Sequence, residues 1–115
     1  TLIESGAKEE NISRNDVPGS FELSLGGQLM AQKEEIDAVI CLGCIIQGET
    51  RHFDFIASAV AHGISDVGLK YNKPVIFGVL TPENQQQALD RAGGKHGNKG
   101  VELAVAALKI VALNQ

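Results

Sequence analysis

The sequence predicts an α/β fold in which a parallel β-sheet carries helices on both faces. Two apolar runs, residues 37–46 and 75–80, have the uninterrupted hydrophobic character of strands that are buried on both sides. Residues 54–71 and 98–113 carry apolar side chains at helical spacing. Strand and helix alternate at lengths typical of βαβ units, whose crossovers are right-handed. With 115 residues, the chain is expected to form a single domain over residues 1–115.

Glycine and proline punctuate the N-terminal part of the chain. Residues 2–8 resemble the end of a helix that stops at Gly6, a residue suited to the position after a helix. Residues 9–16 are polar and fit at most an edge strand. After Pro18 and Gly19, Ser20 is expected to cap a helix that continues to about Lys33.

Stop and start signals delimit the later elements. Residues 72–74, Asn-Lys-Pro, are expected to end the helix over residues 54–71, and the strand over residues 75–80 follows. Thr81 as N-cap and Pro82 at the first helical position predict a short polar helix over residues 83–92. The helix over residues 98–113 is apolar around much of its circumference, which indicates burial against the sheet.

Composition and charge exclude several classes of protein. A hydrophobic content of 43% with 21% charged residues is ordinary for a globular domain, and the absence of Trp implies an aliphatic core. The net charge of −4 argues against general nucleic-acid binding. No apolar stretch approaches the length needed to span a membrane, and no signal-peptide pattern opens the chain, so the default expectation is a cytoplasmic protein.

Cys41 and Cys44 form a C-x-x-C pattern inside the strand expected over residues 37–46. Such a pattern fits a redox pair or half of a zinc site, but no second cysteine pair completes a metal site. Positions three apart in a strand also point to opposite faces. We therefore expect two small, reduced core residues.

A basic, glycine-rich segment precedes the last helix. Residues 91–100 contain Arg91, Lys95, His96 and Lys99 among four glycines. Glycine allows a ligand to approach the backbone, and a helix start offers unpaired N–H groups and the positive end of the helix dipole. The segment therefore predicts an anion site, in particular for a phosphate; the alternative is a helix C-cap and a loop with solvated charges. P-loop spacing fails because Asn98 stands where glycine is required, and a dinucleotide fingerprint would not lie between two helices.

The polar segment after the first apolar strand offers further candidates. Ligands of open parallel sheets bind beyond the carboxyl ends of the strands. His52 is a candidate general acid or base, because histidine alone titrates near neutral pH without perturbation; the alternative is a histidine that caps the following helix. Glu49 and Thr50 would offer polar groups beside it, and Glu22 would bind a substrate N–H group or favour the N-terminus of its own helix.

Five segments carry a resemblance when they are taken in order: VPGSFEL at 17–23, DAVI at 37–40, GETRHFD at 48–54, FGVLT at 77–81 and RAGGKHGNKG at 91–100. Together they resemble the 6,7-dimethyl-8-ribityllumazine synthase family from about Gly6 to the C-terminus. The resemblance implies a transferase of riboflavin synthesis that condenses 5-amino-6-(D-ribitylamino)uracil with 3,4-dihydroxy-2-butanone 4-phosphate and releases phosphate and water. It implies no metal or organic cofactor. It also implies a three-layer, flavodoxin-like parallel sheet and a homo-oligomer (pentamer, decamer or icosahedral capsid) with active sites between subunits.

The resemblance assigns a role to each matching position. Ser20, Phe21 and Glu22 would hold the ribitylaminouracil, together with the strand end Cys44, Ile45 and Ile46. Glu49 and Thr50 would contact the butanone phosphate, and His52 would transfer protons. From a neighbouring subunit, Phe77 would lie against the pyrimidine and Arg91 would bind the phosphate, with Lys99 nearby.

The chain departs from the family pattern because it begins inside the first helix, so the first strand of the family and its terminal aromatic residue are missing. The gap would expose apolar surface beside the strand over residues 37–46, and we expect an incomplete record of a longer protein. Gln47 also stands where many relatives carry a basic residue. Two other functions remain open: a non-catalytic assembly subunit, and a flavin- or phosphate-binding module of the same fold.

Overall fold

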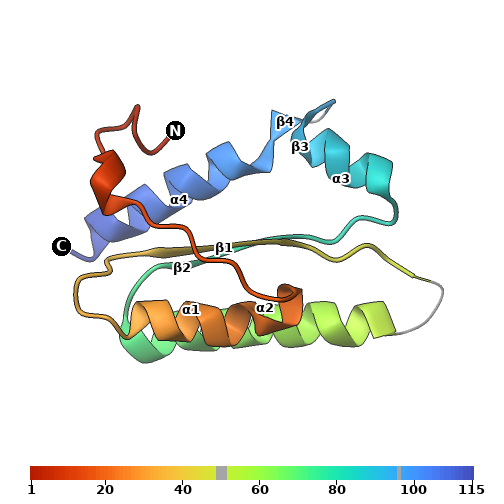
Figure 1. Ribbon diagram of the computed structural model, residues 1–115, viewed down its shortest axis with the longest axis horizontal. Helices are drawn as coiled ribbons and strands as arrows, with labels where there is room; N and C mark the ends of the chain where they lie inside the picture. Colours follow the sequence, from red (N-terminus) through yellow and green to blue (C-terminus); the bar gives the residue numbers. More distant parts are fainter. Residues whose placement is uncertain (49–51, 96) are drawn as a thin grey trace.

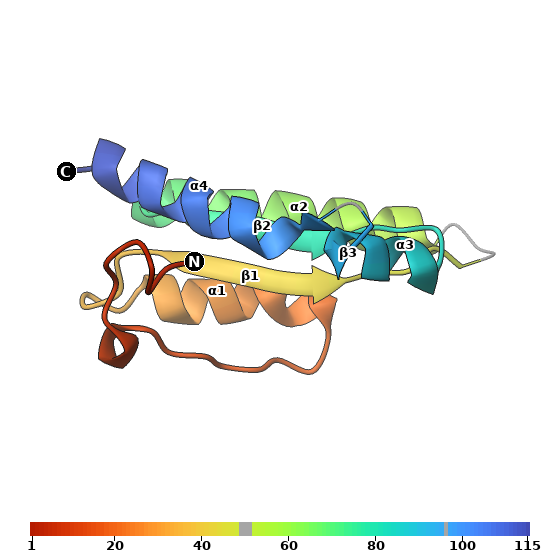
Figure 2. The same ribbon diagram turned by 90° about the horizontal axis from the view of Figure 1, so that it is seen from above.

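The computed structural model describes residues 1–48, 52–95 and 97–115, and within them it has three layers. A sheet of two parallel strands separates α4 (Lys99–Leu113) from the pair α1 (Leu23–Ala31) and α2 (His52–Tyr71), as Figures 1 and 2 show. The strands β1 (Val39–Cys44) and β2 (Val75–Leu80) are in continuous parallel register, from Val39 opposite Val75 to Cys44 opposite Leu80. The predicted α/β class, with helices on both faces of a parallel sheet, is therefore confirmed.

The core lies between the sheet and the α1–α2 layer. Val60 and Ile64 of α2 are each 1% exposed and pack with Cys41 of β1 and Val79 of β2. Burial of such side chains stabilises a fold by about 1.5–3 kcal/mol each. The expectation of an aliphatic core is confirmed.

Gly78 sets the distance between the sheet and α4. A Cβ built on Gly78 would lie 2.6 Å from Leu103 Cδ1 of α4 and 2.8 Å from the carbonyl oxygen of Cys41. Only glycine allows this approach, which buries Leu103 against β2. Leu42 of β1 is nevertheless 64% exposed, so the prediction that β1 is buried on both faces is wrong.

The chain after β2 continues the sheet instead of starting a helix. The backbone N–H of Ile45 donates to the carbonyl of Leu80 at 2.8 Å, and that of Gln47 donates to the carbonyl of Pro82 at 2.9 Å. These bonds hold the segment in an extended path, so the prediction of Thr81 as a helix N-cap is wrong. The helix α3 (Gln85–Arg91) begins later and is capped by Asn84.

The N-terminal segment ends its first turn at Gly6, as expected, but forms no strand after it within the described residues 7–18. One turn over residues 2–6 ends at Gly6, whose φ is +107°; the N–H of Ala7 bonds to the carbonyl of Leu2, as in a Schellman helix end. A 3₁₀ turn, η1 (Glu9–Asn11), follows. Beyond it the described chain to residue 18 pairs with no strand, so residues 9–16 do not form the edge strand that the sequence left open.

Ser20 does not cap α1. It begins a second 3₁₀ turn, η2 (Ser20–Glu22), and its hydroxyl donates to the carbonyl of Cys44 at 3.5 Å. The helix α1 also ends two residues before the predicted Lys33. Lys73 Nζ donates to the carbonyls of Ala31 and Lys33, each at 2.8 Å, and thereby closes this helix end.

The remaining boundaries lie close to those expected. The helix α2 ends at Tyr71, after which Asn72 takes a φ of +52°, and α4 begins one residue later than predicted. A short antiparallel hairpin of β3 (Ala92–Gly94) and β4 (Gly97–Asn98) joins α3 to α4 and was not predicted. Of the helices in the described ranges, none combines the length and apolar character needed to cross a bilayer.

Candidate functional site

A cavity of about 300 Å³ opens at the carboxyl end of β2, beside α3 and α4. Its two cationic side chains come from either side of the glycine hairpin, since Arg91 ends α3 and Lys99 begins α4. The structure thus brings Arg91 and Lys99 together in one cavity. Among the residues that the structure describes, the cavity is lined by Val79, Leu80, Thr81, Pro82, Gln87, Arg91 and Lys99.

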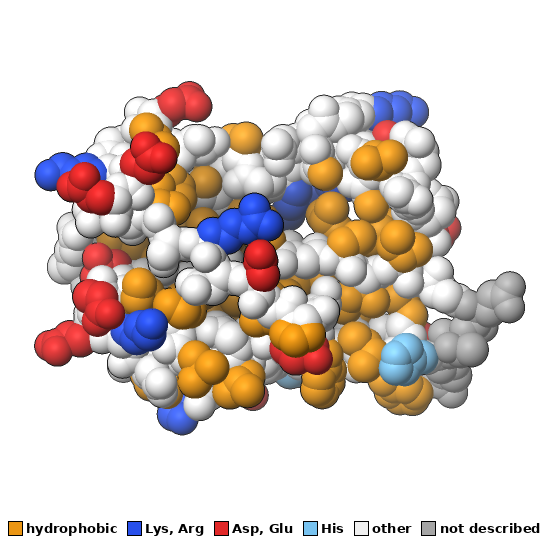
Figure 3. All heavy atoms as spheres, viewed as in Figure 1, with side chains coloured by type: hydrophobic (Ala, Val, Ile, Leu, Met, Phe, Trp, Pro, Cys, Tyr) orange, Lys and Arg blue, Asp and Glu red, His pale blue; other side chains and the backbone are white. Residues whose placement is uncertain are grey.

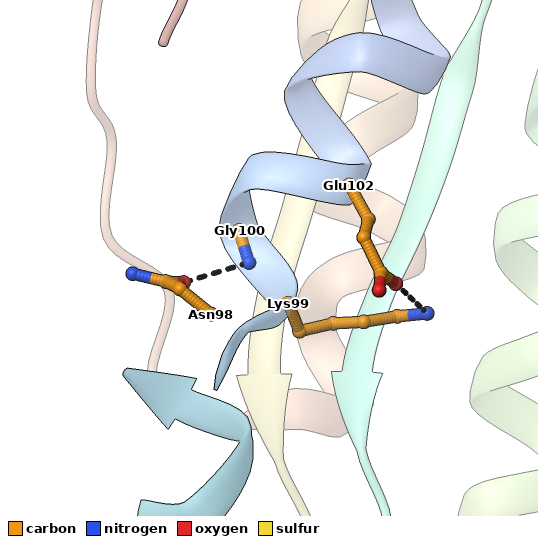
Figure 4. A network of polar contacts seen from close by, with 4 residues as sticks. All are labelled: Asn98, Lys99, Gly100 and Glu102. Atoms are coloured by element: carbon orange, nitrogen blue, oxygen red, sulfur yellow. Dashed lines mark hydrogen bonds and ion pairs between the residues drawn. The ribbon is translucent and has the colours of Figure 1, made fainter. Parts of the chain in front are cut away.

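Asn98 fixes the point at which α4 begins. Its backbone pairs with Ala92 in the hairpin, while its side-chain oxygen accepts a hydrogen bond from the N–H of Gly100 at 2.9 Å (Figure 4). This contact satisfies one of the unpaired N–H groups at the helix start. Because Lys99 is the next residue, the cap also fixes the position of its backbone beside the cavity.

Glu102 adds an acidic group to this cationic site. Lys99 Nζ lies 2.8 Å from Glu102 Oε2, and Figure 4 shows the two side chains directed toward one another. The hydrogen bond and charge of Lys99, with a further contribution from the charge of Arg91, lower the pKa of Glu102. Glu102 was not among the residues expected from the sequence, although its spacing of three residues from Lys99 on a helix indicates such a pair.

A second group of candidates gathers where η2 meets the end of β1. Ser20 is half-buried against Cys44, and a Cβ built on Gly43 would lie 2.8 Å from the Ser20 hydroxyl oxygen. Phe21 is 57% exposed, and Glu22 is also exposed. The predicted positions 20–22 and Cys44 are therefore neighbours in the fold.

The other residues of this strand end have different surroundings. Ile45 is half-buried and its N–H is bonded to Leu80, whereas Ile46 is 47% exposed. Glu49 and Thr50 lie outside the described residues, as does His96.

His52 and Phe77 are separate from the cationic cavity. His52 is exposed at the first position of α2, which lies on the opposite face of the sheet from α4 (Figure 1). Phe77 is 39% exposed, and strand alternation places it on the same face of β2 as Val75 and Val79. Neither His52 nor Phe77 is one of the described residues that line the cavity.

Cys41 and Cys44 are both free thiols. Cys41 is 3% exposed, and this burial raises the pKa of its thiol to about 11. Cys44 is exposed, so the prediction of two core residues is wrong for Cys44, because alternation turns it away from the face that Cys41 buries. In the part of the chain that the structure describes, no group of three or more His, Cys, Asp or Glu side chains is arranged to hold a metal ion.

Comparison with known proteins gives a consistent result over the whole chain. The family described as 6,7-dimethyl-8-ribityllumazine synthase matches residues 1–115. A protein of that name from Cytophaga hutchinsonii is 66% identical over 111 residues, which cover 96% of this chain and 70% of the relative. Another from Parabacteroides distasonis is 52% identical over 96% of this chain and 69% of its own length. A third, from Porphyromonas gingivalis, is 50% identical over 100% of this chain and 71% of its own length.

Proposed function

This chain belongs to the 6,7-dimethyl-8-ribityllumazine synthase family, and we propose that it catalyses the reaction after which the family is named. The substrates would be 5-amino-6-(D-ribitylamino)uracil and 3,4-dihydroxy-2-butanone 4-phosphate, and the step would be a transferase reaction of riboflavin biosynthesis. The single observation that carries the proposal is the cavity where Arg91 and Lys99 converge at the carboxyl end of β2.

The cavity has the chemistry of a phosphate site. The guanidinium of Arg91 presents planar donors that match phosphate oxygens, and the ammonium of Lys99 adds a second positive charge. The Gln87 amide and the Thr81 hydroxyl line the same cavity and supply neutral donors. Arg91 and Lys99 would hold the phosphate of the butanone substrate until it leaves.

His52 would transfer protons during the condensation. The primary amine of the uracil condenses with the carbonyl of the butanone phosphate to form an imine, with loss of one water. Elimination of phosphate leaves an enol that tautomerises to a new carbonyl, and the ribitylamino nitrogen closes the ring on that carbonyl with loss of a second water. None of these steps needs an activated protein nucleophile. Holding two substrates in reactive geometry can lower a barrier by about 7–11 kcal/mol, whereas one general acid–base group adds roughly 10²–10⁴-fold. Holding the two substrates in place would therefore lower the reaction barrier more than proton transfer by His52 does.

The ribitylaminouracil would lie at the junction of η2 and β1. Contact between the Ser20 hydroxyl and the Cys44 carbonyl at 3.5 Å supports this placement, since it joins the two segments that the resemblance assigns to this substrate. Phe21 offers an exposed aromatic face and Glu22 an exposed carboxylate for substrate N–H groups. Ile45 and Ile46 would complete the strand end, and Glu49 and Thr50 would contact the butanone phosphate.

The complete site would form between two copies of the chain. The cationic cavity and His52 belong to layers on opposite faces of the sheet, which supports a site that takes Arg91 and Lys99 from one copy and His52 from the next (Figure 1). Phe77 would come from the copy that supplies Arg91. Exposed apolar side chains also favour assembly, since Phe21, Leu25 and Leu69 are 57%, 59% and 75% exposed. Figure 3 shows hydrophobic side chains gathered on the visible face near the carboxyl end of the sheet. The assembly would be a pentamer, a pair of stacked pentamers or a closed shell.

The proposal is tested by mixing the assembled protein with both substrates and following the fluorescence of the lumazine product. We expect Arg91→Ala to raise KM for the phosphate substrate, and His52→Ala to lower kcat without abolishing turnover. Arg14→Ala is the matched control, because Arg14 is exposed and pairs with Asp16 at 3.2 Å, outside the cavity. An unchanged KM in Arg91→Ala contradicts the assignment. Absence of product from an assembled sample favours a scaffold or flavin-binding role instead.

A further inference from the structure

One carboxylate beside the cationic cavity has no part in the reaction described above. Glu102 lies on the first turn of α4, and its Oε2 is 2.8 Å from Lys99 Nζ (Figure 4). The Lys99 side chain is 36% exposed and that of Glu102 is 65% exposed. In the structure, one of the two cations that line the cavity already has an anionic partner.

We propose that Glu102 is a positioning residue that acts as an exchangeable counter-ion of Lys99 and competes for its ammonium with the phosphate of the substrate and with released inorganic phosphate. The inference rests on the proposed function, since it takes the cavity to be the phosphate site. It assigns Glu102 no contact with the reacting atoms.

The local charges support this competition. Arg91 and Lys99 contribute two positive charges, and Glu102 contributes one negative charge beside them. Glu102 is a carboxylate at neutral pH, as an exposed glutamate ordinarily is, and Lys99 and Arg91 lower its pKa further. A phosphate that enters the cavity therefore reaches the ammonium of Lys99 by displacing Glu102 or by sharing the ammonium with it, and it is repelled by the carboxylate in either case.

The exposure of the pair makes exchange easy. Solvent-exposed ion pairs contribute little to stability, because both side chains are well hydrated when they separate. A reaction that releases phosphate also requires that the product does not remain bound to two cations. A carboxylate that recaptures Lys99 would speed this release while leaving Arg91 to orient the incoming substrate.

The alternative is a purely structural pair. A Lys–Glu contact at i,i+3 and an acidic residue on the first turn both stabilise a helix. In that case, removing the charge of Glu102 would loosen the start of α4 and weaken phosphate binding or leave it unchanged. Competition predicts the opposite sign, so the sign of the change separates the two roles.

The test is titration of the intact protein with inorganic phosphate at fixed ionic strength, followed by calorimetry. We expect Glu102→Gln to bind phosphate about threefold to tenfold more tightly, since both the competing ion pair and the repulsion are removed. Glu102→Asp keeps the charge and should stay near the wild-type affinity. Glu34→Gln removes the same charge from an exposed position before β1 and should leave the affinity unchanged. In turnover assays, phosphate should inhibit Glu102→Gln more strongly than it inhibits the wild type.

Arg91→Ala distinguishes the failure of this inference from the failure of the proposed site. If Arg91→Ala loses phosphate binding but Glu102→Gln binds no more tightly than the wild type, competition by Glu102 is refuted and the phosphate site stands. If Arg91→Ala binds phosphate as well as the wild type, the cavity is not the phosphate site and both proposals are overturned.

Discussion

Replacing Gly78 with alanine tests whether the close approach of α4 to the sheet maintains the cationic cavity. Gly78 is buried in β2, and an added Cβ would lie 2.6 Å from Leu103 Cδ1 and 2.8 Å from the carbonyl oxygen of Cys41. The end of the Leu103 side chain can rotate away. The Cys41 carbonyl belongs to the backbone of the neighbouring strand, so the strands must separate or shift.

The two contributions to the change in stability have opposite signs. Overpacking of this kind lowers the free energy of unfolding by about 1–3 kcal/mol. Replacing glycine by alanine also reduces the conformational freedom of the unfolded chain, which raises the free energy of unfolding by about 0.4–1 kcal/mol. We therefore expect the free energy of unfolding to fall by about 1–2 kcal/mol, or Tm by about 4–8 °C for a domain of this size. Since Lys99 begins α4 and Val79 lines the cavity, phosphate affinity should fall as well.

Urea denaturation and phosphate titration measure the two effects separately. Gly48→Ala is the matched control, because a Cβ on Gly48 would meet none of the described atoms within 4 Å. Its free energy of unfolding should stay within about 0.5 kcal/mol of the wild type. A Gly78→Ala protein with wild-type stability and wild-type phosphate affinity would refute the reasoning that glycine is required at this contact.

Three further predictions concern single side chains. Lys73→Met removes both hydrogen bonds, each 2.8 Å long, that close the end of α1; we expect a loss of about 1–2 kcal/mol in urea denaturation, against no loss for the exposed Lys109→Met. A thiol reagent at pH 8 should modify Cys44 in the folded protein and Cys41 only after unfolding. Because burial raises the pKa of Cys41 from 9.0 to about 11, its contribution to stability is present below pH 9 and is lost as the pH rises toward 11. Cys41→Ala should remove that decline.

The sequence predicted best the elements that strong local signals delimit. The strand β2 matches its predicted range because Pro74 precedes a β-branched run and Pro82 follows it. The helix α2 ends where Asn72 can adopt a positive φ, and α4 begins beside Asn98, a strong N-cap residue. In each case a local preference and the tertiary packing favour the same boundary.

The errors arose where tertiary pairing overrides a local preference. Thr81 and Pro82 form a strong helix start, yet the hydrogen bond from Gln47 to Pro82 keeps this segment beside the sheet, and Asn84 caps α3 instead. The glycine hairpin has no alternation of apolar and polar residues, so no periodic pattern indicates its strands.

In the candidate site too, the sequence indicated the residues with strong local signals and did not indicate those whose role depends on tertiary contacts. Arg91 and Lys99 were predicted as an anion site because their charges stand among glycines next to a helix start, and the structure brings both to one cavity. Glu102 was missed because an acidic residue on the first turn also serves the helix dipole. The proposed relation of His52 to Arg91 would depend on a second copy of the chain, so within one sequence only the resemblance to the family indicated it.

Mixed assemblies of two variants test this shared site most directly. His52→Ala and Arg91→Ala chains would be produced together, and the activity per subunit would be compared with that of each variant alone. If each site takes His52 from one copy and Arg91 from the next, random assembly of equal amounts leaves about a quarter of the sites with both residues intact, and activity recovers accordingly. Mixed particles that contain both chains by mass, but are no more active than the average of the two parents, would contradict the account.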